Sequence, residues 1–187
     1  MITEPTTHYC SVCGHVTHRQ VPPGDQRLRD VCGHCHTIHY QNPQVITGAL
    51  AVYQDKVLLC KRAIEPRKGY WTLPGGFWEL GETIEAGAAR ETLEEACAHI
   101  TIESLYTLFN VVHVGQLSAF FLARLEQPEF APGEESEEVA LFAEAEIPWD
   151  QLAFSTITRT LRLFFADRQR GAFPMRLELI PPPERQG

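Results

Sequence analysis

The sequence has no apolar stretch approaching the ~18 residues that a membrane-spanning helix needs, so we expect no membrane partner. Its first residues, Met1–Pro5, carry neither a basic flank nor an apolar run, so we expect no secretory signal and a cytoplasmic location. It also lacks an excess of positive charge, because 24 Asp and Glu residues outnumber 16 Lys and Arg residues and the net charge is −8. Affinity for the nucleic-acid backbone needs a basic surface, so we expect no nucleic-acid partner.

Length and composition describe an ordinary globular chain. Its 187 residues, 44% hydrophobic and 21% charged, allow one sizeable α/β core and a small appendage. The turn-forming Asn42-Pro43 dipeptide predicts a boundary between a segment over residues 1–42 and a main domain over residues 43–170. Residues 171–187 are predicted to form a C-terminal tail, whose proline-rich end, Pro181–Gly187, is expected to be disordered.

Four of the six cysteines form two C-x-x-C pairs near the N-terminus. The pairs are Cys10 with Cys13 and Cys32 with Cys35, with eighteen residues between the inner cysteines. This spacing is typical of a structural zinc site with four thiolate ligands. A disulfide framework is disfavoured in a cytoplasmic chain, and a redox motif would need one C-x-x-C beside a strand and a helix. We therefore expect a small zinc ribbon whose folding depends on the metal.

The rest of this segment does not form a basic face. Its arginines are balanced by acidic residues, and the nearby histidines are expected at the surface. The residues are Arg19, Arg27 and Arg29 against Asp25 and Asp30, with His8, His15, His34, His36 and His39. A structural or dimerising role, and with it a homodimer, is therefore favoured over nucleic-acid binding.

The main domain contains a glycine turn followed by a glutamate-rich helix. Pro74-Gly75-Gly76 opens the turn, and a helix is predicted from about Thr83, its N-cap, to Cys97. Glu91, Glu94 and Glu95 lie at positions i, i+3 and i+4 of this helix. Like charges at such spacing destabilise a helix by roughly 0.2–0.5 kcal/mol per pair, and a bound divalent cation would offset that cost.

The spacing around these glutamates is specific. Gly76 is followed after five residues by Glu82 and after seven more by Arg90-Glu91-x-x-Glu94-Glu95. This pattern resembles the Nudix box of the Nudix hydrolases, with three departures from the usual box at Thr92, Cys97 and Ala98. The resemblance covers about residues 43–170 and implies an α/β/α sandwich, so the predicted fold is a Nudix-type α/β sandwich with a small N-terminal zinc ribbon.

The resemblance also implies the roles of individual residues. Glu91, Glu94 and Glu95 would bind Mg²⁺ (or Mn²⁺) together with a backbone carbonyl of the turn at Gly75. Arg90 would orient these carboxylates. The general base of the family often lies on a loop outside the box, and Glu135 and Glu138 are the candidates, with Glu138 favoured because it adjoins a strand.

Other runs predict the remaining elements. Strands are expected over Val45–Tyr53, Val57–Arg62, Thr101–Val114, Gln116–Glu126 and Val139–Ala143, and a closing helix over Ser155–Gln169. Trp71 is expected in the core, and Lys61 and Arg62 are as consistent with a phosphate contact as with a solvated strand end.

Together these features predict Mg²⁺-dependent hydrolysis of a nucleoside diphosphate linked to another moiety, releasing a nucleoside monophosphate. Zinc-ribbon Nudix proteins include NADH pyrophosphatases, whose S-Q-P-W-P-F-P-type motif is absent from residues 107–113, and ADP-ribose or FAD pyrophosphatases. Residues 38–43, 62–67 and 147–149 resemble the second group, which implies ADP-ribose and FAD as the favoured substrates. NADH hydrolysis and a non-catalytic nucleotide-sensing module are the alternatives.

Overall fold

A computed structural model describes residues 9–182 of the chain, and Met1–Pro5, His8 and the end of the predicted tail lie outside this range. Backbone contacts divide the chain into two compact units, Met1–Pro43 and Gln44–Gly187. This division falls one residue beyond the predicted boundary. No helix within residues 9–182 combines the length and apolarity required to cross a membrane.

The N-terminal unit is a small three-stranded antiparallel sheet. Its strands β1 (Thr17–Gln20), β2 (Arg29–Cys32) and β3 (Ile38–His39) pair in the order β1-β2-β3. Val31 is buried on the central strand, and Cys10 and Cys32 are buried beside it. Such a short segment buries little apolar area, so a metal held by its cysteines would supply much of its folding free energy.

The second unit is built on one mixed sheet with the strand order β10-β5-β4-β9-β8-β11, to which β6 and β7 add at β5 and β4. Its strands are β4 (Gln44–Tyr53), β5 (Lys56–Arg62), β6 (Trp71–Thr72), β7 (Gly75–Phe77), β8 (Ile100–Val111), β9 (Gln116–Leu125), β10 (Ser136–Phe142) and β11 (Arg176–Leu179). The central pair, β4 and β9, runs parallel, whereas β8 and β9 form an antiparallel hairpin.

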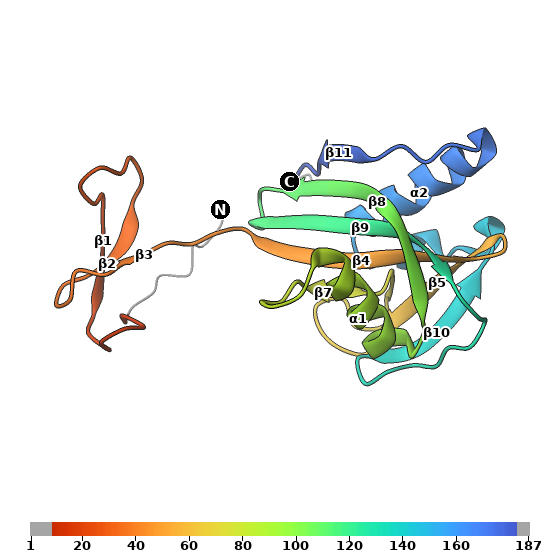
Figure 1. The fold of residues 1–187 in the computed structure, drawn as a ribbon, viewed down its shortest axis with the longest axis horizontal. Helices are drawn as coiled ribbons and strands as arrows, with labels where there is room; N and C mark the ends of the chain where they lie inside the picture. Colours follow the sequence, from red (N-terminus) through yellow and green to blue (C-terminus); the bar gives the residue numbers. More distant parts are fainter. Residues whose placement is uncertain (1–8, 183–187) are drawn as a thin grey trace. The chain divides into compact units, whose positions relative to one another are not determined.

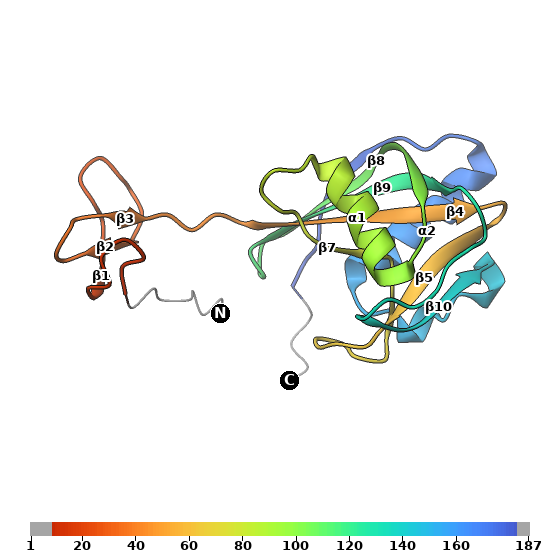
Figure 2. The same cartoon turned by 60° about the horizontal axis from the view of Figure 1, so that its bottom comes forward.

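Two helices cover opposite faces of this sheet, α1 (Ile84–Ala96) and α2 (Ser155–Arg170), as Figures 1 and 2 show. Successive residues of a strand point to opposite faces, so each strand contributes to both layers. On the α2 side Val57 and Leu59 pack in a cluster with Leu161, whereas Leu58 belongs to a second cluster with Ala96 of α1. The predicted α/β/α sandwich is confirmed.

The glutamate-rich helix has well-defined ends. The side chain of Thr83 accepts a hydrogen bond from the Ala86 N–H at 3.2 Å, which confirms the predicted N-cap. The helix ends at Cys97, which has a left-handed backbone with φ of 48°. Residues with a Cβ tolerate this conformation poorly, so Cys97, one of the three departures from the usual box, lies where glycine is favoured.

The predicted tail needs correction. Residues 171–187 contain strand β11, which pairs in parallel with β8 and places Leu177 opposite Leu108. Asp167 of α2 holds this strand through Arg176 and accepts a hydrogen bond from the Tyr106 hydroxyl of β8 at 2.8 Å. The sheet therefore gains an edge strand after its last helix.

Candidate active site and zinc-binding unit

The glycine turn lets helix α1 approach the sheet closely. A Cβ on Gly75 would lie 2.8 Å from the Cα of Gly48, and a Cβ on Gly76 would lie 2.5 Å from Oε2 of Glu91. At Gly75 the near atoms are backbone atoms of Gly48 and Thr47, so a Cβ would force the chain to shift, whereas at Gly76 a Cβ would displace the Glu91 carboxylate. The turn therefore lies directly against the Glu91 carboxylate.

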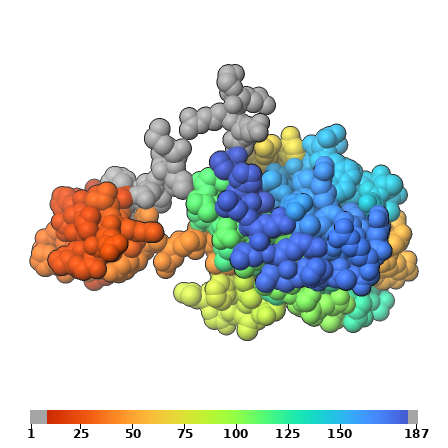
Figure 3. Space-filling view, turned by 90° about the horizontal axis from the view of Figure 1, so that it is seen from above, coloured from red at the N-terminus to blue at the C-terminus, as the bar shows by residue number. Residues whose placement is uncertain are grey.

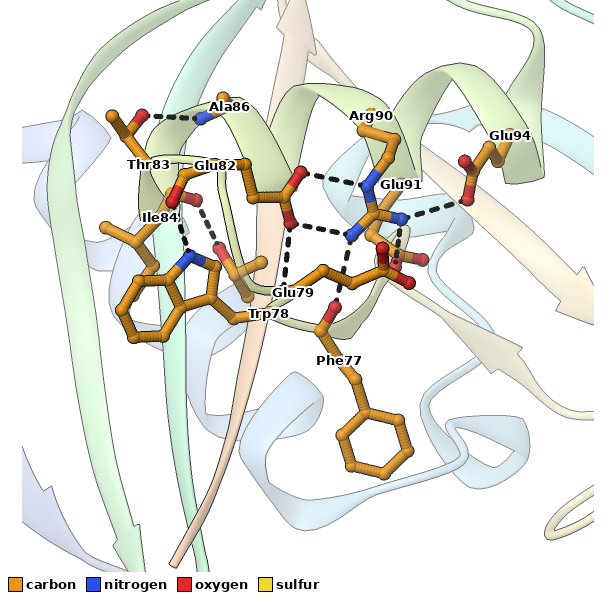
Figure 4. Close-up of polar contacts among 11 residues, drawn as sticks. Phe77, Trp78, Glu79, Glu82, Thr83, Ile84, Ala86, Arg90, Glu91 and Glu94 are labelled. Atoms are coloured by element: carbon orange, nitrogen blue, oxygen red, sulfur yellow. Dashed lines mark hydrogen bonds and ion pairs between the residues drawn. The ribbon is translucent and has the colours of Figure 1, made fainter.

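Arg90 organises the carboxylates around this turn (Figure 4). Its guanidinium donates to both oxygens of Glu82 at 3.0 and 2.9 Å, to Glu91 at 2.7 Å and to Glu94 at 3.0 Å. A fifth hydrogen bond, at 3.1 Å, goes to the backbone oxygen of Phe77. Arginine has five N–H donors in a fixed planar arrangement, and this geometry positions all of these groups at once.

Glu82 fixes the loop that precedes the helix. One of its carboxylate oxygens accepts the Glu79 N–H at 3.0 Å, and its backbone oxygen accepts Trp78 Nε1–H at 3.1 Å. The hydrogen bonds from Arg90 hold the pKa of Glu82 below its usual range. Trp78 remains 45% exposed, whereas Trp71 is buried in the core as expected.

Two of the three helical glutamates are withdrawn from solvent. Glu95 is 6% exposed, and its Oε2 accepts the Gly75 N–H at 3.0 Å. Burial raises its pKa to about 7 and also raises the pKa of Glu91. Within residues 9–182 Glu95 forms no ion pair with a lysine or arginine. A buried carboxylate without a cationic partner is costly, which points to a cation that the protein binds.

The donor set fits Mg²⁺ or Mn²⁺. Hard divalent cations take carboxylate, carbonyl and water oxygens, and they usually keep several waters. Glu91, Glu94 and Glu95 offer carboxylates beside the turn, with Glu94 the most exposed at 58% of its side chain. Arg90 donates hydrogen bonds to the carboxylates of Glu91 and Glu94 and so fixes their orientation beside the turn.

A loop after β9 brings a further carboxylate to this group. The Ala131 and Gly133 N–H groups donate to the last carbonyls of α1, those of Ala96 and Glu95, at 2.9 and 3.0 Å. Gly133 packs so closely against the Glu94 carbonyl that no Cβ could fit. Two residues later, the charge of Glu135 contributes to raising the pKa of both Glu91 and Glu95.

Glu138 lies on the other face of the sheet. It pairs with Lys61 in the register of β10 and β5, and the two side chains form an ion pair at 3.8 Å. Lys61 in turn lies over the ring of Trp71 in the α2-side core. A register irregularity between Ser136 and Glu138 precedes this residue. The structure therefore brings Glu135 to the carboxylates and turns Glu138 away from them.

Arg62 lies near the site and, among the described residues, forms no ion pair with a carboxylate. Its Nε donates to the Pro66 backbone oxygen at 2.8 Å, and its guanidinium stacks 5.4 Å from the ring of Phe154. It lies close enough to Glu95 to lower the pKa of that residue. Within residues 9–182 no carboxylate reaches ion-pair distance of Arg62. The remaining Nη groups can meet an anionic ligand.

The N-terminal unit gathers the four predicted zinc ligands. The Sγ atoms of Cys10, Cys13, Cys32 and Cys35 lie within 4.8 Å of one another, and all are free thiols. Cys10 lies 3.6 Å from Cys35, and Cys13 lies 3.4 Å from Cys32. With Zn–S bonds of about 2.3 Å a tetrahedral site separates its sulfurs by about 3.8 Å, so the donor set fits zinc.

Backbone N–H groups support these sulfurs. The His34 and Cys35 N–H groups each donate to the Cys32 sulfur at 3.4 Å, and they lower its pKa. Hydrogen bonding with Thr37 lowers the pKa of Cys35 to about 6. Both effects favour the thiolate form that zinc requires.

Two family models match the chain. The NUDIX domain model covers residues 42–165, and the Nudix N-terminal model covers residues 8–41. The NAD-capped RNA hydrolase NudC of Edwardsiella ictaluri is 37% identical over 89 residues, which cover 47% of this chain and 32% of that protein. The match thus spans about a third of the length of that relative.

Two further similarities cover more of the proteins compared. The ADP-ribose pyrophosphatase of Methanocaldococcus jannaschii is 32% identical over 121 residues, covering 62% of this chain and 69% of that protein. The crystal structure of a NUDIX hydrolase from Nitrosomonas europaea superposes with a TM-score of 0.90 at 48% identity, covering 92% of this chain and 98% of that one.

Proposed function

Because the chain belongs to the NUDIX family and is a Nudix hydrolase, we propose that it hydrolyses the diphosphate of a nucleoside diphosphate linked to a second moiety. The products would be a nucleoside monophosphate and the phosphorylated second moiety. ADP-ribose is the favoured substrate, and FAD is the next. The similarity to the archaeal relative named ADP-ribose pyrophosphatase supports this choice.

One observation carries the proposal. Glu91 and Glu95 are withdrawn from water beside the Gly75–Gly76 turn, and the pKa of each is raised by burial. In a purely structural role these carboxylates would only destabilise the fold at neutral pH. Binding of a divalent cation, and of the diphosphate that the cation holds, would offset the cost of burying these carboxylates.

Glu91, Glu94 and Glu95 would hold Mg²⁺ or Mn²⁺, together with the carbonyl of Gly75. When bound, the metal supplies Lewis-acid polarisation of the phosphate and activation of a water molecule. Arg90 keeps the Glu91 and Glu94 carboxylates in place through its hydrogen bonds.

Two other residues would take part in the reaction, one toward the attacking water and one toward the diphosphate. Glu135, delivered by the loop clamped to the end of α1, is the general base that takes a proton from the attacking water. The Nη groups of Arg62 would bind a phosphate oxygen and offset the charge that builds on the diphosphate as its P–O bond breaks. Glu138 has no part in this step.

Hydrolysis of NADH is the second candidate. Its support is the 37% identity over 89 residues to a relative named for the hydrolysis of NAD-capped RNA. The net charge of −8 gives no support to RNA as the substrate, since RNA binding relies on basic contacts to phosphate. A free dinucleotide is therefore the form in which this candidate is tested.

The N-terminal unit would be a structural zinc ribbon, with Cys10, Cys13, Cys32 and Cys35 as ligands. Thiolates persist in reducing compartments, so the proposed location is the cytoplasm.

A substrate panel tests the proposal. Release of AMP from ADP-ribose, FAD and NADH is measured with and without Mg²⁺ for the wild type, Glu94→Gln and the control Glu85→Gln. We expect Mg²⁺-dependent turnover, highest on ADP-ribose, that falls at least about 100-fold in Glu94→Gln. Glu85 lies in the first turn of α1, away from the turn at Gly75, and its variant should match the wild type. Equal rates for Glu94→Gln and wild type would refute the proposal.

A further inference from the structure

Strand β11 leaves one side of the sheet unpaired. It is the last strand of the order β10-β5-β4-β9-β8-β11, and within residues 9–182 no other strand pairs with its outer edge. In Figure 3 the dark blue atoms of this end of the described chain lie at the molecular surface. An unpaired edge offers backbone N–H and C=O groups to another strand.

The strand also carries exposed apolar side chains on one face. Leu177 is 61% exposed and Leu179 is 64% exposed, and the preceding Met175 is also exposed. Alternate residues of a strand share a face, so these three side chains form one row beside the edge. Clustered exposed apolar side chains of this kind mark interaction surfaces.

The charged residues of β11 do not protect its edge. Arg176 is engaged by the buried Asp167, and Glu178 forms a two-pronged ion pair with Arg159 of α2 at 2.7 and 2.8 Å. Within Arg176–Leu179 there is no proline or lysine of the kind that usually blocks an edge strand.

The sequence of the strand complements itself. In an antiparallel pair of two copies related by a twofold axis, centring on Leu177 places Leu177 opposite its own equivalent. Arg176 then faces Glu178 of the other copy, and Met175 faces Leu179 of that copy. Centring on Glu178 would instead bring two like charges together, which is unfavourable. The charges therefore favour the register centred on Leu177.

We propose that β11 is a homodimer interface, in which the β11 strands of two copies pair antiparallel about Leu177 and join the two sheets. The two rows of apolar side chains then pack against each other on the face opposite α2. The partner is a second copy of this chain, because the self-complementary register needs no other sequence.

The mass in solution tests the interface. Light scattering with size-exclusion chromatography of the zinc-loaded full chain should give twice the mass of one chain for the wild type and for Val112→Asp. Val112 is exposed in the turn that follows β8 and serves as the matched control. Leu177→Asp should give the monomer mass, with an unchanged circular dichroism spectrum. A monomeric wild type, or a dimer that survives Leu177→Asp, would overturn the proposal.

Crosslinking tests the register. Directly opposed residues have Cα atoms about 4.5–5.5 Å apart, within the reach of a disulfide. In a Cys97→Ser background with a mild thiol oxidant, Leu177→Cys should form a covalent dimer that reductant reverses. Leu179→Cys should not, because its equivalents would lie roughly 13 Å apart. Crosslinking through Leu179→Cys but not through Leu177→Cys would overturn the proposed register.

Discussion

The carboxylate of Glu91 occupies the space where a Cβ at Gly76 would lie, 2.5 Å from the nearest carboxylate oxygen. The neighbouring Gly75 is constrained differently, because its Cβ would meet the backbone of Gly48 and Thr47. A side chain at position 76 would therefore meet the Glu91 side chain, which can move, whereas a side chain at position 75 would meet the backbone of the neighbouring strand. Substitution of Gly76 should therefore affect the catalytic rate, whereas substitution of Gly75 should affect the stability of the fold.

Replacing each glycine by alanine should show this difference. Gly76→Ala should fold with nearly the wild-type melting temperature but lose catalytic rate, because it displaces the Glu91 carboxylate. Gly75→Ala should lower the free energy of unfolding by roughly 1–3 kcal/mol, since backbone must move. Chemical denaturation and AMP release measure the two effects. An active, stable Gly76→Ala variant would contradict the role of Glu91.

The two loop glutamates make a matched pair for the general base. Glu135→Gln should lower kcat by about 100-fold or more with little change in KM, because proton transfer to a positioned base contributes this much. Glu138→Gln should stay near the wild-type rate, since Glu138 pairs with Lys61 on the other face of the sheet. Steady-state kinetics measure kcat and KM of both variants. A large loss of kcat in Glu138→Gln, with Glu135→Gln near the wild-type rate, would identify Glu138 as the base instead.

Glu95 predicts a pH dependence of stability in magnesium-free buffer. Its folded pKa, about 7, lies above the usual glutamate pKa of 4.5, so the folded state holds the proton more tightly. This contribution to stability is fully present below about pH 4.5 and is lost as the pH rises through 7. By pH 8 the loss of stability amounts to roughly 2–3 kcal/mol.

The variant Glu95→Gln isolates this contribution. It should lose less stability than the wild type between pH 5 and 8 in urea unfolding without Mg²⁺. Adding Mg²⁺ at pH 8 should stabilise the wild type and leave the variant less affected, because a ligating carboxylate must be ionised. Parallel pH profiles for the two proteins would show that Glu95 does not titrate in this range.

Cys97 offers a test at the end of α1. Its backbone is left-handed, with φ of 48°, and this conformation costs a residue with a Cβ about 1 kcal/mol or more. Cys97→Gly should therefore raise the melting temperature, whereas Cys97→Ala should not. Calorimetry measures both variants, and a destabilised Cys97→Gly would contradict the strain at this position.

Local sequence predicted the parts of the site that lie on one helix. The cap at Thr83 and the helical run that carries Glu91, Glu94 and Glu95 depend on residues three and four apart, which a sequence displays directly. The cysteine spacing is equally local within each pair. Both helices of the main domain and its five longest strands, β4, β5, β8, β9 and β10, were predicted from local patterns of the same kind.

Features that depend on distant pairing were missed. Strand β11 exists because it pairs with β8, more than sixty residues earlier, and its R-L-E-L sequence gives no sign of that partner. Glu138 is paired with Lys61 in the register of β10 and β5, and the sequence alone does not show this cross-strand partner. The double contact of Arg90 with Glu82 depends on the path of the loop between them.

The most direct test of the account is a crystal of the protein soaked with Mn²⁺ and AMP, with anomalous diffraction recorded at the manganese edge. The account predicts a manganese peak bonded to carboxylate oxygens of Glu91 and Glu95, with the AMP phosphate on the same ion. An anomalous map without a peak at these glutamates, while AMP is bound elsewhere, would contradict it.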